Sequence, residues 1–470
     1  MNLRFGRMLG LGFSLLLSSM MSVAQNGSAP PKTWVDKDTG HRVFRLTDEP
    51  NSSAFYFNVN AYSPDKRFMI YTAPDGIHTL EMATRATRLL VPNPPAPAGA
   101  AEGRFRGGNH TIVVGHKTDS IFFSRADPAT HLSTIFKADM NTGQVTKLAT
   151  LPPRASISTV NADETQGAGV YDETEAGVQQ EYGGNDPRRA TGDPQRAPLV
   201  QPESKGAMME RRLAARIPVV LFTVDLQTGK VHELLHSTDW IGHLLFSPID
   251  PGLLMYCHEG PWQKVDRIWT IHTDGSQNRL MQNRTMLMEI AGHEFCGIDG
   301  ETIWYDWQTP KGEDFWLAGY HLSGNGDHKR VAYHLLRDEW SIHFNVNDGA
   351  TLFCGDGGDP GQVARAPDGE WIELFHPEWR KNDGGIDSPD FIKAGMFHSE
   401  HLVNMKHHNY RLEPNVRFSP DSKLVLFTSN MFGPSYVFGV EVEKAAAGAS
   451  DTASTPELGR RYGADPTPTH

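Results

Sequence analysis

The residues richest in chemistry lie between positions 242 and 269, in GHLLFSPIDPGLLMYCHEGPWQKVDRIW. His243 and His258 bracket a predicted strand–turn–strand unit, and Glu259 and Trp262 follow the second histidine. Each of these side chains carries a polar group that needs a partner when it is buried, so a hairpin that only packs rarely concentrates them at one strand end. The segment therefore predicts a site for a carbohydrate or a carboxylate.

A second group of polar residues occupies 407–421, HHNYRLEPNVRFSPD, just before a predicted strand. It offers His408, Glu413 and Asn415, and His293 in GHEFCGIDG supplies a further imidazole from another part of the chain. Imidazole combined with oxygen ligands suits a divalent ion such as Mn²⁺, Ca²⁺ or Zn²⁺. The alternative is a polar turn in which Glu413 and Asn415 satisfy backbone groups.

These residues need a scaffold that brings distant strand ends together, and the chain repeats one suitable unit. Short β-rich runs alternate with turns rich in Asp, Gly and Pro, and helical periodicity is almost absent after the N-terminal segment. Repeated four-stranded units of this period predict an all-β fold, a seven-bladed β-propeller over residues 33–443. Strand ends near a propeller axis converge on one central pocket, which favours a shared site for several of the histidines beside predicted strand ends. These are His243, His258, His293, His343, His407 and His408.

Three segments depart from the repeat. Residues 1–24 have Arg4 and Arg7 before a short apolar run and end in small residues, which predicts a secretory signal cut after Ala24. The protein is therefore expected to be exported, periplasmic or secreted, and to have no stable membrane span once the signal is removed. Residues of about 170–215 form an insertion rich in Gly, Pro, Glu and Arg, expected to lie near the site. Residues 444–470 are low in apolar side chains and predict a disordered tail.

Composition narrows the class of protein. The chain has 470 residues and a formal charge of −12, and loss of the predicted signal leaves −14. An acidic chain is a poor candidate for binding nucleic acid, and an anionic substrate would have to be attracted by a local cation or metal. The three cysteines, Cys257, Cys296 and Cys354, lack CxxC spacing, so they are expected to be buried strand residues rather than a disulfide framework.

Several motifs occur together in an order that resembles oligogalacturonate lyases, over roughly residues 33–443. They are VFRLTDEP with FYFNVNAYSPD, DLQTGKVHELL, IGHLLFSP leading into CHEGPW and VDRIW, HEF followed by DG, HFNVNDG leading into GDGGD, and FSPDSKLVLFTSN. The resemblance implies a seven-bladed propeller that cleaves short pectin-derived oligogalacturonides by β-elimination around a divalent cation, most often Mn²⁺, with Ca²⁺ or Mg²⁺ as alternatives. It implies His243 as the general base and His293 as a metal ligand.

Two places differ from the family pattern. Before the last FSPD the family carries a glutamine and two histidines, where this chain has Tyr410, Glu413, Asn415 and Val416. The ligand set implied here is therefore His293, Glu413 and Asn415 with His408, or with His407 in its place. A catalytic arginine of the family falls near Val220, so Arg216, or Arg212 of the insertion, is expected to replace it.

The remaining site residues are predicted to bind substrate. Arg267 could pair with a sugar carboxylate through its planar fork, although a strand arginine of this kind more often bridges neighbouring blades. His258 and His343 are expected to face the sugar, with structural hydrogen bonding as the alternative. Two other classes remain open: a non-catalytic periplasmic propeller that binds sugar or acts as a scaffold, and a glycoside hydrolase that uses Glu259 and Glu413.

Overall fold

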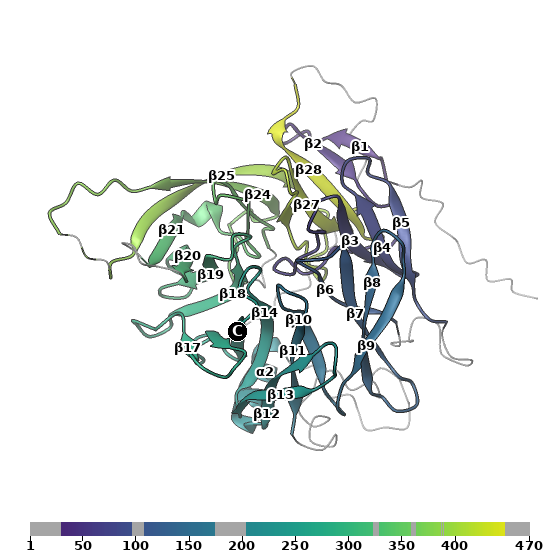
Figure 1. Ribbon diagram of the computed structural model, residues 1–470. Helices are drawn as coiled ribbons and strands as arrows, with labels where there is room; N and C mark the ends of the chain where they lie inside the picture. Colours follow the sequence, from purple (N-terminus) through teal and green to yellow (C-terminus); the bar gives the residue numbers. More distant parts are fainter. Residues whose placement is uncertain are drawn as a thin grey trace, which may run out of the picture. The chain divides into compact units, whose positions relative to one another are not determined.

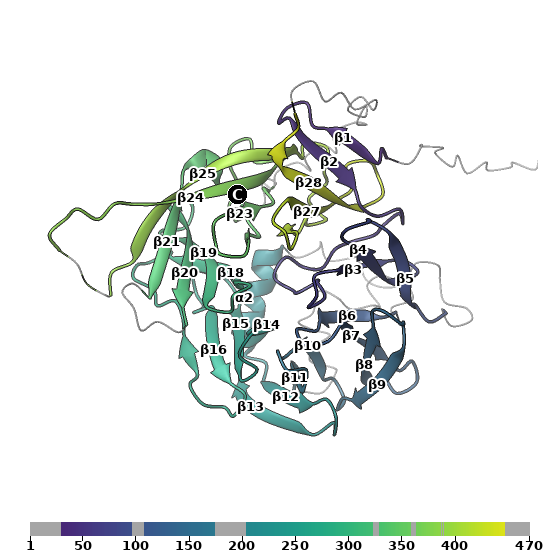
Figure 2. The same cartoon turned by 45° about the horizontal axis from the view of Figure 1, so that its top comes forward.

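The computed structural model describes residues 30–95, 108–173, 204–322, 329–358, 363–386, 388 and 390–446. The predicted signal, most of the insertion and nearly all of the predicted tail lie outside these residues, so they remain predictions. The described chain is almost entirely antiparallel sheet, and Figure 2 shows its sheets standing around a common centre. No described helix is long and apolar enough to cross a bilayer.

The described strands form six hydrogen-bonded sheets, and the eight-stranded one consists of two blades joined by a parallel pair, so they group into seven blades, as predicted. The early blades follow chain order (Figure 1). Blade 1 contains β3 (Phe68–Ala73), β4 (Gly76–Glu81) and β5 (Thr87–Pro92). Blade 2 contains β6 (His110–Val114), β7 (Ser120–Ala126), β8 (Ser133–Asp139) and β9 (Val145–Thr150). Blade 3 contains β10 (Ser156–Val160), β11 (Gln166–Asp172), β12 (Val219–Asp225) and β13 (Val231–Ser237).

The next two blades carry most of the predicted chemistry. Blade 4 contains β14 (Trp240–Phe246), β15 (Leu253–Glu259), β16 (Ile268–His272) and β17 (Arg279–Leu280). Blade 5 contains β18 (Ile290–Cys296), β19 (Thr302–Gln308), β20 (Phe315–His321) and β21 (Arg330–Leu335). Between blades 5 and 6 lies a single 3-10 turn, η2 (Arg337–Glu339).

The last two blades close the ring. Blade 6 contains β22 (Asn345–Val346), β23 (Phe353–Gly355), β24 (Trp371–Trp379) and β25 (Lys393–Asn404), and β25 pairs in parallel with β21 of blade 5. Blade 7 contains β26 (Arg417–Phe418), β27 (Leu424–Ser429) and β28 (Tyr436–Lys444), to which β2 (His41–Arg45) and β1 (Thr33–Val35) from the start of the chain are added. Pairing between β2 and β28 therefore joins the two ends of the described chain.

Local sequence explains the turns and the packing. In the D-x-x-T-G turns, the Asp139 and Asp225 carboxylates accept hydrogen bonds from backbone groups two and three residues later, which stabilises the turn without a partner strand. The core lies between successive blades: Met255 of blade 4 belongs to the same buried cluster as Tyr305 of blade 5. Cys257 and Cys354 are buried as expected, and Cys296 is partly buried.

The described part of the insertion contains a helix that the sequence analysis missed. Helix α2 (Lys205–Ala215) begins at Ser204, whose side chain accepts a hydrogen bond from the Ala207 N–H. It lies in the connection between β11 and β12, and Glu210 pairs with Lys264 of the β15–β16 connection at 2.8 Å. The insertion thus contacts the connection that carries Trp262, which agrees with its expected place near the site.

Candidate functional site

Three histidines hold the same unusual backbone conformation. His243, His293 and His343 have φ angles of 46°, 47° and 49°, and they are spaced by 50 residues along the chain. Left-handed backbone is costly for residues other than glycine and is concentrated at functional sites. In β14 and β18 the ladder register also shifts at the histidine, as in a β-bulge, and bulges redirect side chains next to active sites.

The three rings belong to one site. The His293 and His343 ring centroids are 4.7 Å apart, and the Tyr56 ring lies 5.8 Å from His243 and 5.4 Å from His343. Glu413 approaches the same place, since its Oε2 is 4.0 Å from His343 Nε2. The structure therefore brings together His243, His293, His343 and Glu413 from four different blades or connections.

Two of the histidines are supported by buried carboxylates. His293 Nδ1 lies 2.6 Å from Asp306 Oδ2, and His343 Nδ1 lies 2.9 Å from Asp356 Oδ2. Such a pair orients the imidazole and makes its second nitrogen a better metal ligand. Burial, together with the charges of His343 and Arg267, lowers the pKa of His293 well below its ordinary value. His293 is therefore neutral, as a metal ligand must be.

His243 is held in a different way. Its Nε2 lies 2.8 Å from Glu259 Oε1, which leaves Nδ1 to face a substrate. Burial by itself lowers the pKa of His243, but the hydrogen bond to Glu259 and the charge of Glu294 outweigh it and raise the pKa above the ordinary value. Arg267 and His243 in turn overcome the effect of burial on Glu259 and hold its pKa well below the usual range. Glu259 is thus an ionised partner of the imidazole.

The prediction that Arg267 binds substrate is wrong. Its side chain is 2% exposed and bonds Glu259 at 2.9 Å and Glu294 at 3.1 Å. Because Glu259 lies on β15 and Glu294 on β18, the arginine bridges blades 4 and 5, which was the alternative interpretation. Burying one guanidinium and two carboxylates requires this kind of mutual pairing, and it directs the arginine at Glu259 and Glu294 rather than at a sugar.

Two of the predicted metal ligands are otherwise engaged. Both ring nitrogens of His408 have partners, Ser429 Oγ at 3.0 Å and the Leu412 carbonyl at 2.6 Å, so no lone pair remains for a cation in the central site. The Asn415 side chain accepts a hydrogen bond from Phe57 N–H and donates one to the Glu413 carbonyl. These contacts make His408 and Asn415 structural residues, whereas His293 and Glu413 keep their place in the site.

The two candidates for the catalytic arginine, Arg216 and Arg212, have different surroundings. Arg216 ends helix α2 with a φ of 48° and pairs with Asp239 on the surface, its side chain 57% exposed. Arg212 lies over the ring of Trp240 at 4.1 Å, and Trp240 is the ladder partner of Glu259. Arg212 thus contacts the strand that pairs with Glu259, whereas Arg216 pairs with Asp239 at the surface. His258 contacts Asp239 and the Trp269 ring, at 3.8 Å and 5.2 Å.

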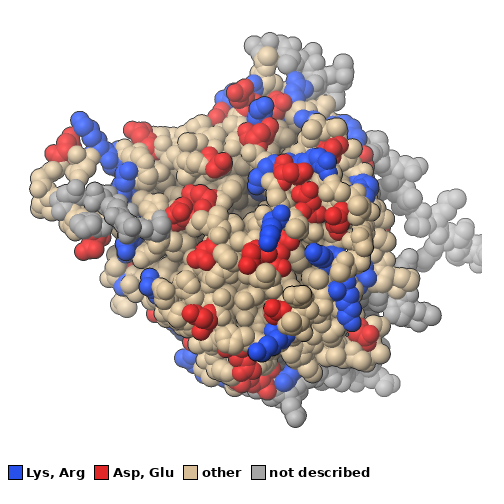
Figure 3. Space-filling model, viewed as in Figure 1, with Lys and Arg blue, Asp and Glu red and all other residues tan. Residues whose placement is uncertain are grey.

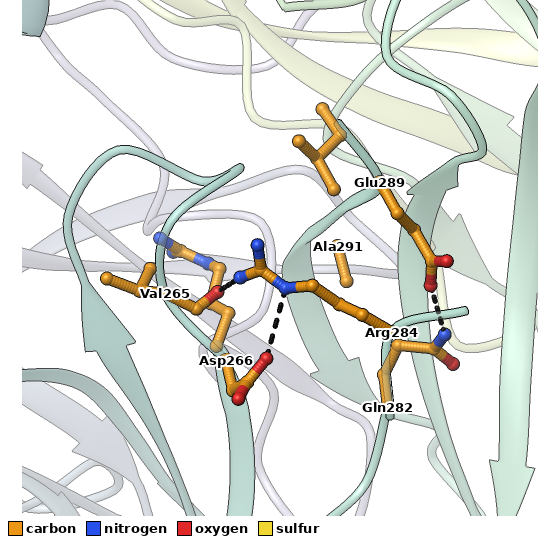
Figure 4. A pocket seen from close by; sticks show the side chains of 8 residues that line it. Val265, Asp266, Gln282, Arg284, Glu289 and Ala291 are labelled. Carbon is orange, nitrogen blue, oxygen red and sulfur yellow. Dashed lines mark hydrogen bonds and ion pairs between the residues drawn. The ribbon is translucent and has the colours of Figure 1, made fainter. Parts of the chain in front are cut away.

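Trp262 lines the site beside His293, and Arg284 holds its backbone on the side away from the site. Its ring lies 5.0 Å from His293, and a Cβ at residue 292 would come within 2.5 Å of that ring, which explains Gly292. Arg284 bonds the backbone carbonyls of Trp262, Gln263 and Val265 and the Asp266 carboxylate. Figure 4 shows Arg284 reaching across to Val265 and Asp266, with Glu289 bonded to Gln282 beside it.

One group of residues in the described chain has the spacing of a metal site, but its negative charge is already neutralised by an arginine. Potential ligand atoms of His243, Cys257 and Glu259 lie within 4.8 Å of one another. However, the Arg267 guanidinium already bonds Glu259, and a second cation beside it would be repelled. A cation near His293 and His343 is better supported, because Asp306 and Asp356 beside them each leave Oδ1 buried without a hydrogen-bond partner.

Sequence reasoning singled out Trp262 but missed Tyr56, Asp306 and Asp356 as members of the site. The regular spacing of His243, His293 and His343 was the available signal, because it places the same strand position in successive blades. Asp306 and Asp356 also follow their histidines at one constant interval. Tyr56 has no such mark, since it lies before β3, far from the other residues in sequence.

Comparison with known proteins agrees with this architecture. The sequence model of the family described as oligogalacturonate lyase matches residues 211–446, half of the chain. This chain belongs to the oligogalacturonate lyase family. The match covers β12 to β28 and so includes His243, His293, His343 and Glu413.

Curated relatives and solved structures extend the comparison. The oligogalacturonide lyase of Pectobacterium atrosepticum is 25% identical over 242 residues, 47% of this chain and 55% of the relative, and that of Dickeya dadantii is 26% identical over 235 residues. The chain thus spans about half the length of the curated relatives it matches. An oligogalacturonate lyase in complex with manganese superposes with a TM-score of 0.63 at 19% identity, over 88% of this chain and 96% of that structure. The enzyme from Vibrio parahaemolyticus gives the same TM-score at 18% identity.

Proposed function

We propose that this member of the oligogalacturonate lyase family cleaves short oligogalacturonides by metal-assisted β-elimination and releases unsaturated uronate products. The observation that carries the proposal is that one site contains two histidines that bond their carboxylates through different ring nitrogens. His243 keeps Nδ1 free beside an ionised Glu259, and His293 keeps Nε2 free beside Asp306. The first arrangement suits a base, and the second suits a ligand.

The residues present fit a divalent cation. His293 and Glu413 would hold it, and the buried Asp306 and Asp356 side chains orient His293 and His343 from behind. Nitrogen with carboxylate oxygen is a set that suits Mn²⁺, with Mg²⁺ and Ca²⁺ as alternatives, and one structural neighbour is described with manganese. When bound, such an ion neutralises the substrate carboxylate and stabilises the charge that develops beside it. Lys and Arg are intermixed with Asp and Glu over the face in Figure 3, so a local cation must attract the sugar acid.

The protein's own residues carry the proton transfer. Elimination removes the hydrogen at C5 of a uronate and expels the oxygen at C4. His243 Nδ1 takes the C5 proton, and Glu259 stabilises the imidazolium that forms. Trp262, held by Arg284, limits the space around His293 and excludes water from that side of the site. The hydrolase alternative is disfavoured because Glu259 is ionised and paired with Arg267, so it has no proton to donate.

Incubation of the purified protein with digalacturonate and Mn²⁺ tests the proposal directly. A lyase produces ultraviolet absorbance from the new C4–C5 double bond, and each cleavage yields one unsaturated product. A hydrolase releases reducing ends without that absorbance. Tight binding of digalacturonate with neither signal would contradict the proposal and support the sugar-binding propeller instead.

A further inference from the structure

Tyr56 occupies the space between two of the site histidines. Its ring lies 5.8 Å from the His243 ring and 5.4 Å from the His343 ring, and its hydroxyl is 3.4 Å from His343 Nε2. His343 is fixed in turn by Asp356 at 2.9 Å. An Asp–His–Tyr chain of hydrogen-bonding groups therefore ends in the hydroxyl of a ring that lies next to the ring of the proposed base.

The segment that carries Tyr56 is held by other blades. Arg417 is buried and donates to the carbonyls of Phe55, Tyr56 and Val59, and Asn415 accepts from the Phe57 N–H at 3.1 Å. The Phe57 ring stacks on His343 with centroids 5.0 Å apart. This many contacts for so short a segment fixes the phenol in advance, as precise positioning of a reacting group requires.

The chemistry of the proposed reaction leaves a role open. In a galacturonate ring the C5 hydrogen and the C4 oxygen project from opposite faces, so one side chain cannot serve both. The departing oxygen leaves as an alkoxide unless it receives a proton, and a positioned acid accelerates such a step by about 10²–10⁴-fold. Glu259 is ionised, Arg267 is enclosed by carboxylates, and Arg216 pairs with Asp239 at the surface, so none of these three supplies that proton. The described contact of Arg212 is with the Trp240 ring rather than with a site histidine.

We propose that Tyr56 is the catalytic acid, whose phenolic proton passes to the departing glycosidic oxygen while His243 removes the C5 proton. This inference rests on the proposed function. The C5–H electron pair becomes the C4–C5 double bond, and the C4–O bond breaks with its pair on oxygen, which takes the phenolic hydrogen. The resulting phenolate and imidazolium exchange one proton through solvent, which restores both residues with no net proton change. Burial raises the pKa of Tyr56, so the phenol keeps its proton until the reaction.

Substitution Tyr56→Phe tests the inference because it removes only the hydroxyl. With digalacturonate and Mn²⁺, we expect kcat to fall by about 100-fold or more, with the calorimetric Kd for digalacturonate unchanged. A uronate that carries fluoride at C4 needs no proton for departure, so its turnover, measured as released fluoride, should be nearly the same in the variant and the unmodified protein. Tyr171→Phe, on β11 of blade 3 where the hydroxyl bonds exposed Glu233, is the matched control and should keep full activity on both substrates.

Each other result has a defined meaning. Equal losses on the two substrates, a weakened Kd, or an undiminished kcat on digalacturonate in Tyr56→Phe would overturn the role of Tyr56. If the unmodified protein forms no unsaturated product, the proposed function itself fails, and that outcome is distinguishable because it does not depend on any variant. The thermal midpoint of Tyr56→Phe, measured alongside, should match that of the unmodified protein because the phenol makes one long hydrogen bond.

Discussion

Blades 4 and 5 present the same backbone with two different histidines. In each blade a glycine precedes a left-handed histidine on the inner strand, and the ladder shifts at that point. Gly242 pairs with Cys257, whereas Gly292 pairs with Asp306. The carboxylate in blade 5 holds His293 by Nδ1, while in blade 4 Glu259 holds His243 by Nε2. The position of the carboxylate that bonds each imidazole therefore decides which ring nitrogen faces the site. The pKa of His243 is raised, whereas the pKa of His293 is lowered.

The largest effects are expected from replacing His243 and His293, and the two replacements should change different properties. His243→Ala should reduce kcat on digalacturonate by about 100-fold or more and leave the affinity for Mn²⁺ unchanged, because it removes the base alone. His293→Ala should abolish measurable Mn²⁺ binding in a calorimetric titration. Equal losses of Mn²⁺ affinity in both variants would show that the blades do not differ as described.

A smaller effect is expected for the carboxylate beneath His293. Asp306→Asn should weaken Mn²⁺ binding by about 10–100-fold, since partners of this kind orient the ligand and increase its basicity. Calorimetry with Mn²⁺ measures the change. Asp299→Asn, on the exposed turn of the same blade, is the control and should bind Mn²⁺ as the unmodified protein does. Unchanged affinity in Asp306→Asn would remove the metal-ligand assignment of His293.

The pH profile reports the partner of His243. Glu259 raises the pKa of His243, so the neutral base persists only at pH values above that raised pKa. Glu259→Gln should therefore shift the acidic limb of kcat/KM toward lower pH, because the imidazolium loses its ionised partner. The measurement is kcat/KM for digalacturonate across pH, with a thermal melt to confirm that the variant is folded. A limb that moves to higher pH, or does not move, contradicts the role assigned to Glu259.

The smallest effect concerns Cys257, which occupies in blade 4 the place of Asp306. Cys257→Ala should leave kcat and Mn²⁺ affinity unchanged, because Glu259 rather than Cys257 holds His243. Loss of a small buried side chain should lower the free energy of unfolding by about 1 kcal/mol, measured by denaturant titration. A large loss of activity would mean that the two blades use this position in the same way.

Much of the fold follows from local sequence. Asp139 and Asp225 close their turns by bonds to nearby backbone groups, so the repeat of strands and turns was readable and predicted seven blades correctly. Helix α2 was not predicted, although Ser204 caps it and most of its residues are strong helix formers, because it is short and lies in an insertion rich in Gly and Pro. None of its residues is buried, and the Glu210–Lys264 and Arg212–Trp240 contacts that hold it come from distant segments.

The site was predicted in part, for a physical reason. The sequence by itself predicted that His243, His293 and Glu413 would share one cavity, because strand ends near a propeller axis converge there. It could not determine what each side chain does, since that depends on neighbours from other blades. Only the tertiary structure enclosed Arg267 between Glu259 and Glu294, engaged both nitrogens of His408, and placed Tyr56 between two histidines. Residue types limit the chemistry, but burial and partners decide which group is charged, paired or free to react.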